Sequence, residues 1–163
     1  MNPLAIGQPV PDFSAESTAG RPFRLSERRG RNLVLYFYPK DDTPGCTQEG
    51  RDFRDLYPEF QELDTDVVGV SRDSLASHER FRCKHELPFE LLSDPDETVC
   101  DLFGVIALKT FYGKPVRGIQ RSTFLIDREG KLVAEWRKVT VKEHAREVLA
   151  TIRELVTRGA AGN

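Results

Sequence analysis

Two kinds of segment alternate along the chain: short apolar runs and longer amphipathic stretches. The run Leu33–Tyr38 is continuous, rich in β-forming residues and stopped by Pro39, which is typical of a central strand covered on both faces. Other segments share this composition and predict a second buried strand and two hairpins: 66–71, the pair 122–126 and 131–136, and a short hairpin around 18–20.

The amphipathic stretches repeat with the period of an α-helix. They predict four helices: one after Pro44 and others at 75–86, 96–103 and 141–156. Pro58 lies inside the first of these stretches and predicts a break, a kink or a boundary between two helical pieces. Because strands and helices alternate, the predicted fold is an α/β domain with a central mixed sheet flanked by helices.

Size and composition narrow the picture further. A chain of 163 residues with 39% hydrophobic content suits one core, so we expect a single domain over 1–163 with a flexible tail at 159–163. Charged residues make up 31% of the chain, but the net charge is only -2 and the signs are interspersed, so no nucleic acid partner is expected. The start does not resemble a signal peptide, and the longest apolar run is too short to span a bilayer. We therefore expect a cytoplasmic protein without membrane contact.

The three cysteines, an odd number, do not indicate the disulfide framework of a secreted domain. Cys46 follows a strand and the turn Thr43-Pro-Gly, where a helix is predicted to begin with Thr43 as N-cap and Pro44 at its first position. The free N–H groups and the dipole of that helix end favour an anion, and therefore a reactive thiolate. One helix end supplies only part of this stabilisation, so a cation is needed, and Arg121 is the candidate. The alternative, a buried structural cysteine, fits the surrounding Pro, Asp, Thr and Gly residues less well.

The segment Pro39-Lys-Asp-Asp-Thr43-Pro-Gly-Cys46 resembles the active-site signature of peroxiredoxins, Pro-x-x-x-Thr-x-x-Cys, and in particular the bacterioferritin comigratory protein, or Q-type, subgroup. The similarity continues through 92–94, 103–105, 112–114 and 118–127, and thus covers nearly the whole chain. It implies a thioredoxin-like fold with an N-terminal β-hairpin extension and an insertion. It also implies a peroxidase that reduces hydrogen peroxide and organic hydroperoxides.

The resemblance also implies roles for single residues. It assigns Cys46 as the peroxidatic cysteine, Thr43 as the hydroxyl that orients the peroxide and Pro39 as the shield over the thiolate. Arg121 is the cationic partner of the thiolate. The backbone N–H groups of Gly45 and Cys46 are the donors to the transferring oxygens. Glu49, one helical turn after Cys46, steers Arg121 in this interpretation, or else belongs to an ordinary surface pair. Without the motif, Thr43 would be only an N-cap, Pro39 only a strand terminator and Arg121 a solvated side chain.

The partner of Cys46 in a disulfide is less directly indicated. Many Q-type members carry a second cysteine five residues after the first, and this chain has Arg51 there. Cys100 lies beside Val99 and Leu102 and is interpreted as a small packed hydrophobe. Cys83 lies in a mostly polar helix, as in some Q-type enzymes, and an intramolecular Cys46–Cys83 disulfide is our expectation. Resolution by an external thiol is the remaining alternative. Mobile regions are then expected over about 43–55 and near Cys83.

Other functions fit the sequence less well than a peroxidase. A thioredoxin-type oxidoreductase needs Cys-x-x-Cys, but Thr43 holds the first position. A hydrolase would need a base, and the three histidines, 78, 85 and 144, are expected at the surface. Neither a metal site from His78, Cys83 and His85 nor a cofactor is expected. A noncatalytic peroxide sensor or redox relay on the same fold is the alternative function. The Q-type resemblance implies a monomer that a thioredoxin-like or glutaredoxin-like protein reduces.

Overall fold

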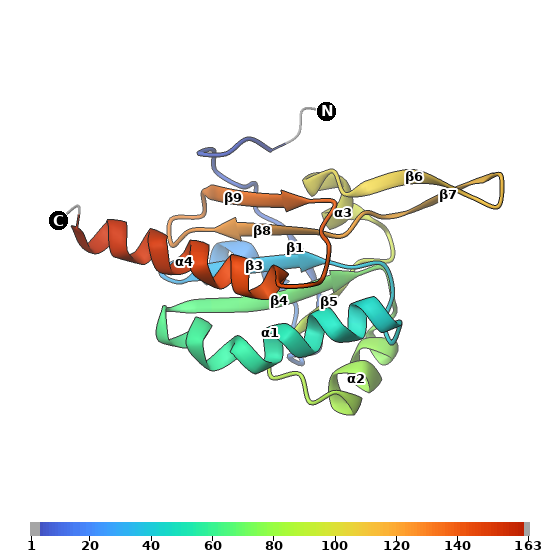
Figure 1. Cartoon of the computed structure of the whole chain (residues 1–163), viewed down its shortest axis with the longest axis horizontal. Coiled ribbons are helices and arrows are strands. Elements are labelled where there is room, and N and C mark those ends of the chain that lie inside the picture. The colour runs from blue at the N-terminus through green and yellow to red at the C-terminus, as the bar shows by residue number, and fades with distance from the viewer. Residues whose placement is uncertain (1–3, 162–163) are drawn as a thin grey trace.

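A seven-stranded mixed sheet forms the centre of the protein in a computed structural model that describes residues 4–161 (Figure 1). Its strand order is β2-β1-β5-β4-β3-β8-β9. The strands span Ser14–Ser17 (β1), Phe23–Arg24 (β2), Asn32–Phe37 (β3), Thr65–Ser71 (β4), Leu91–Ser93 (β5), Ser122–Ile126 (β8) and Leu132–Arg137 (β9). β3 pairs in parallel with β4 and antiparallel with β8, so the predicted mixed sheet is confirmed.

Four α-helices and one 3-10 turn complete the main body: α1 at Pro44–Glu62, α2 at Leu75–Lys84, α3 at Thr98–Phe103, α4 at His144–Ala161 and the 3-10 turn at Leu25–Arg28. All four predicted helices are present. The break or boundary predicted at Pro58 is wrong, because α1 continues through it as one helix of 19 residues. The helix α4 continues to Ala161, within the tail expected at 159–163, and positions 162 and 163 lie outside the described residues.

Alternate residues of β3 enter two separate hydrophobic cores, since side chains alternate between the faces of a strand. Leu33, Leu35 and Phe37 pack with the N-terminal hairpin and α3 on one face. Val34 and Tyr36 belong to the other core, which also holds side chains of α1, α2 and α4. Figure 1 shows α1 and α4 side by side over this second face.

Three hairpins extend the sheet or project from it. The hairpins predicted around 18–20 and at 122–126 with 131–136 are confirmed as β1–β2 and β8–β9, which pair antiparallel. A third hairpin was not predicted: β6 at Ile106–Phe111 and β7 at Lys114–Ile119 form a sheet of their own and extend away from the body (Figure 1). Within the described residues, 4–161, no helix has both the length and the apolar character required to cross a membrane.

Candidate active site

The loop between β3 and α1 places Cys46 at the start of a helix, as the sequence predicts. β3 is buried along its whole length and leads into this loop, which ends at Thr43. Thr43 has extended backbone angles and is the N-cap of α1, and Pro44 follows at the first helical position. The Thr47 N–H donates to the Thr43 carbonyl at 2.8 Å, which closes the first turn around Cys46.

The Thr43 side chain does not cap the helix. Its hydroxyl instead donates to the Lys40 carbonyl at 2.8 Å, within the same loop. The hydroxyl proton is therefore engaged, whereas the oxygen keeps lone pairs that can accept a hydrogen bond. The hydroxyl oxygen of Thr43 can therefore accept a hydrogen bond at the start of the helix.

Arg121 lies beside the thiol, and Glu49 lies beside Arg121. Nη2 of Arg121 donates to Sγ of Cys46 at 3.4 Å, and its Nη1 donates to Oε1 of Glu49 at 2.5 Å. Arg121 directly precedes β8, whose antiparallel pairing with β3 brings it to the end of β3 from which the loop starts. Cys46 is 2% exposed and Glu49 1% exposed, so both contacts lie in a region that excludes most water.

Gly45 permits the arginine to come this close. A Cβ at position 45 would lie 3.1 Å from Nη2 of Arg121, tighter than ordinary van der Waals contact. A side chain at position 45 would therefore displace the guanidinium by a few tenths of an ångström, and Gly45 favours its contact with the sulfur.

Burial and charge act in opposite directions on this group. Burial raises the pKa of Glu49 from 4.5 to about 7, although Arg121 opposes the shift. For Arg121, burial lowers the pKa, but Glu49 and Cys46 outweigh it and raise the value overall. The second carboxylate oxygen of Glu49 has no hydrogen-bond partner among the described residues. Desolvation with an incomplete set of hydrogen bonds is what favours the protonated form of Glu49.

An open groove of about 490 Å³ adjoins these residues, with Pro39 and Arg121 in its wall. Ala107, Leu108 and Lys109 of β6 contribute to the same wall, so the unpredicted hairpin borders the groove. The groove is thus part polar and part apolar, with the arginine of the thiol site at one side.

The other two cysteines differ sharply in environment. All three cysteines are free thiols, Cys83 being exposed on α2 and Cys100 buried on α3. Cys100 packs in the first hydrophobic core, and burial together with Asp94 raises the pKa of its thiol well above the ordinary range. An inaccessible and protonated thiol is a poor nucleophile. The interpretation of Cys100 as a packed hydrophobe is confirmed.

The prediction that the histidines lie at the surface is wrong for two of the three. His78 and His144 are buried, and His85 is half-buried. Nε2 of His144 forms a 2.8 Å hydrogen bond with the Thr123 hydroxyl. Burial, together with the nearby charge of Arg121, lowers the pKa of His144 from 6.5 to about 4. Both rings found polar partners far away in the sequence, which a local pattern does not reveal.

His78 belongs to a buried polar cluster that the sequence interpretation missed. Its Nδ1 lies 2.8 Å from Oδ2 of Asp41, which is part of the loop that carries Cys46. With Asp73 the two residues place possible ligand atoms within 4.8 Å of one another, but His78 Nε2 is already engaged with the Leu92 carbonyl at 2.8 Å. One signal was available: His78 stands three residues before the buried Phe81, hence on the same helical face.

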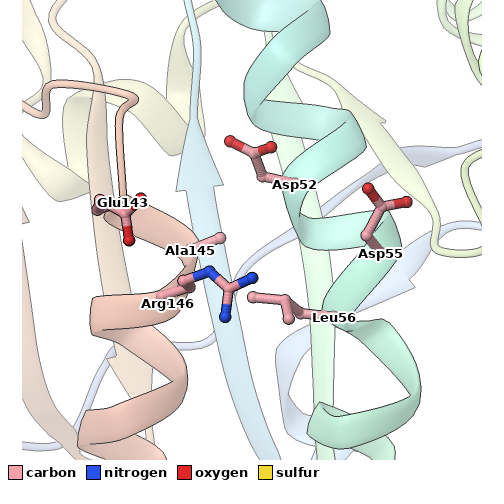
Figure 2. A pocket seen from close by; sticks show the side chains of 6 residues that line it. All are labelled: Asp52, Asp55, Leu56, Glu143, Ala145 and Arg146. Atoms are coloured by element: carbon pink, nitrogen blue, oxygen red, sulfur yellow. The ribbon is translucent and has the colours of Figure 1, made fainter.

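A smaller cavity of about 120 Å³ lies between α1 and α4 (Figure 2). Figure 2 shows Arg146 of α4 extending toward Leu56 of α1, with Asp52 and Asp55 on α1 and Glu143 just before α4. These side chains supply charge but no nucleophile. The thiol beside an arginine lies instead at the loop that begins at Pro39.

A cysteine at a helix start with an arginine at its sulfur, on a thioredoxin-like sheet, defines the class of thiol peroxidases. Comparison with known proteins indicates the same class. The AhpC/TSA family matches residues 6–135. The chain belongs to that family and is a peroxiredoxin of the Bcp or Q type. Peroxiredoxin Bcp of Bacillus subtilis is 49% identical over 152 residues, covering 93% of this chain and 97% of the relative.

Two solved structures support the fold. A mutant of Xylella fastidiosa PrxQ has a TM-score of 0.89 at 40% identity, covering 94% of this chain and 98% of the other. The bacterioferritin comigratory protein of Xanthomonas campestris, studied for its alkyl peroxide reduction activity, has a TM-score of 0.85 at 47% identity, covering 88% and 92%. The predicted thioredoxin-like fold and thiol peroxidase function are therefore confirmed.

Proposed function

We propose that Cys46 is the peroxidatic cysteine, and the contact between its Sγ and Nη2 of Arg121 at 3.4 Å is the observation that carries this assignment. The thiolate attacks the terminal oxygen of a hydroperoxide, the O–O bond breaks, and an alcohol or water leaves after taking up a proton. The sulfur becomes a sulfenic acid while the peroxide is reduced. Arg121 favours the thiolate, and Glu49 holds the guanidinium in place.

The loop supplies the other contacts to the peroxide. Thr43, whose hydroxyl proton is engaged by Lys40, accepts a hydrogen bond from the protonated peroxide oxygen and so orients it. The N–H groups of Gly45 and Cys46 stabilise charge that develops on the transferring oxygens, because donors at a helix start are arranged before the reaction. Pro39, in the wall of the groove, shields the thiolate from solvent.

Cys83 is the proposed resolving cysteine. Its thiol attacks the sulfenic sulfur, an S–S bond replaces the S–O bond, and the oxygen leaves as water. Exposure of Cys83 and burial of Cys100 support this choice. The enzyme is then an atypical 2-Cys peroxiredoxin that a thioredoxin-like or glutaredoxin-like protein reduces.

Hydrogen peroxide and organic hydroperoxides are the proposed substrates, in line with the alkyl peroxide reduction studied in the Xanthomonas campestris relative. The part-apolar groove beside Arg121 suits an organic substituent. The Q-type resemblance further supports a monomer that acts in the cytoplasm.

Peroxide consumption with a dithiol reductant tests the role of Cys46. The Cys46→Ser variant is expected to lose all turnover above the uncatalysed background, whereas Cys100→Ser, which removes a buried thiol outside the loop, retains it. Full activity in Cys46→Ser would exclude the proposal, and peroxide binding without turnover in the wild type would favour a sensor.

Nonreducing peptide mass analysis after one equivalent of hydrogen peroxide tests the role of Cys83. We expect a 46–83 linkage in the wild type and in Cys100→Ser, and none in Cys83→Ser. An intramolecular disulfide that persists in Cys83→Ser through Cys100 would show that the resolving assignment is wrong.

A further inference from the structure

The peroxidatic loop and the helix that carries Cys83 are joined by a buried polar cluster. Asp41 lies in the loop five residues before Cys46, and His78 lies on α2 five residues before Cys83. Both residues are buried, and Oδ2 of Asp41 is 2.8 Å from Nδ1 of His78. A second link, from Asp42 to Lys84 and His85, is exposed to solvent and therefore contributes little.

The hydrogen bonds around this pair account for all but one of its protons. Nε2 of His78 faces the Leu92 carbonyl at 2.8 Å, an acceptor, so Nε2 carries a proton. The Asp41 carboxyl group accepts from the Tyr38 hydroxyl at 2.6 Å and from the Ser77 hydroxyl at 2.8 Å. The remaining proton lies between Nδ1 of His78 and Oδ2 of Asp41. In the latch proposed below it resides on Nδ1, which makes the pair an imidazolium and a carboxylate.

Other titratable groups nearby are consistent with this assignment. Asp73, in the loop before α2, accepts from the Asp41 backbone N–H at 2.9 Å and from the Ser71 hydroxyl at 2.5 Å. Tyr38 directly follows β3, and burial, followed by nearby Tyr36 and Asp41, raises the pKa of its hydroxyl well above its usual range, so it stays a donor. The cluster thus unites the loop after β3, the strand β5 and α2.

Cys83 does not face Cys46 while α2 is in place. On a helix with 3.6 residues per turn, Cys83 is rotated by about 200° from the buried Phe81 and by about 140° from the buried His78. Its thiol is accordingly exposed, whereas Sγ of Cys46 is buried beside Arg121. A disulfide needs Cβ atoms about 4 Å apart, so a bond between an exposed and a buried thiol requires α2, the first turn of α1, or both to turn or unwind.

We propose that the buried Asp41–His78 pair is a latch that holds α2 against the peroxidatic loop and sets the rate at which Cys83 reaches the Cys46 sulfenic acid. Asp41 and His78 are positioning residues for the resolving step and do not touch the peroxide. The proposal rests on the proposed role of Cys83. A closed latch keeps the peroxidatic site assembled for the first step and delays the second.

Separating the two chemical steps tests the latch. Sulfenic acid formation is followed with a dimedone probe in the Cys83→Ser background, and disulfide formation by rapid quenching and mass analysis in proteins that retain Cys83. Since a hydrogen bond to a charged group changes an equilibrium by about 10- to 100-fold, Asp41→Asn and His78→Gln should speed disulfide formation by about that factor. Sulfenic acid formation should not become faster.

Glu79→Gln is the matched control, because it removes a charge from α2 at an exposed position next to His78. It should resolve at the wild-type rate. Hydrogen exchange distinguishes a local latch from general destabilisation: in His78→Gln, exchange should rise in α2 and stay unchanged in α4. Wild-type resolution rates in both latch variants, or equal loss of protection in α2 and α4, would overturn the proposal.

Nitrogen NMR of the imidazole rings gives a readout that does not depend on turnover. In the reduced protein, the ring assigned by its loss in His78→Gln should carry protons on both nitrogens, and Asp41→Asn should remove one of them. An unprotonated Nδ1 in the reduced wild type would exclude a charged latch. If the wild type instead never forms the 46–83 linkage, the resolving role of Cys83 fails, and the NMR result still decides the state of the pair.

Discussion

The carboxyl group of Glu49 is almost completely buried, although burial disfavours its charged form. Burial places its pKa at about 7, so between pH 4.5 and 7 the folded protein binds more protons than the unfolded chain. The stability that this group contributes is fully present below about pH 4.5 and is lost as the pH rises through about 7. The full span corresponds to at most about 3 kcal/mol.

The Glu49→Gln variant should lack this slope. We expect its free energy of unfolding to vary less than that of the wild type between pH 4.5 and 7 in urea titrations. Its peroxidase rate should also fall about tenfold, because Arg121 loses a charged hydrogen bond. Glu62→Gln, at an exposed position of the same helix, is the control. Parallel pH profiles for wild type and Glu49→Gln would contradict the shifted pKa.

His144 acts in the opposite direction. Its folded-state pKa of about 4 lies below the ordinary 6.5, so its contribution to stability is present above pH 6.5 and is lost as the pH falls through about 4. His144→Gln should flatten the acid side of the stability profile by up to about 3 kcal/mol, as measured by urea unfolding at several pH values. An unchanged loss of stability on acidification would show that other groups cause it.

Single residues differ in how far local sequence predicts them. Thr43 and Cys46 are fixed by a turn and a helix start, which are local features, and their backbone placement agrees with the prediction. Arg121 reaches Cys46 only through the pairing of β3 with β8, and the family resemblance rather than periodicity indicated it. His78 and His144 were expected at the surface because their partners, Asp41 and Thr123, are distant in sequence.

Among the elements, α1 contains the least expected residue. Pro58 is exposed inside this continuous helix, where proline removes a backbone hydrogen bond and strains the preceding turn. Tertiary packing of the buried face, with Phe53, Leu56 and Phe60, outweighs this local cost. The helix therefore forms although its sequence predicts an interruption.

Replacing Pro58 by alanine should stabilise the protein. An interior proline costs about 3 kcal/mol relative to alanine, and the greater freedom of the unfolded alanine chain offsets about 1 kcal/mol of the gain. We expect a higher melting temperature in calorimetry, with about 1 to 2 kcal/mol of added stability. Pro44→Ala, at the first helical position where proline is favourable, should show no such gain. A lower melting temperature for Pro58→Ala would contradict this account.

Long buried strands were the most predictable. β3, β4 and β8 are apolar and buried, so their sequences alone identify them. The mostly exposed strands β6 and β7 carry lysines, a proline and a glycine, and they pair with each other in a separate two-stranded sheet. β5 has three residues, too few for a periodic signal.

At the scale of the whole molecule, the β6–β7 hairpin is peripheral to the fold but borders the groove. Ala107 and Gly118 are paired across it, so a two-residue Asn-Gly turn can replace 108–117. The shortened protein should keep its melting temperature within a few degrees and reduce hydrogen peroxide at the wild-type rate. Its kcat/KM for cumene hydroperoxide should fall several-fold, because Leu108 and Lys109 are removed from the groove wall.

Equal effects on the two peroxides would show that the hairpin does not contact the organic substituent. A large loss of melting temperature would show that it supports the fold. The full-length protein with Glu129→Gln serves as the control, because Glu129 is exposed in the turn between β8 and β9.

The division of the interior by β3 has a consequence for the life of the enzyme. Cys46 and Phe81 belong to one core, whereas Cys100, Phe103 and the N-terminal hairpin belong to the other. In the proposed cycle, movement of α2 would disturb only the first core. The second core would then stay intact as a template on which the first reassembles, so repeated oxidation and reduction need not expose the chain to complete unfolding and aggregation.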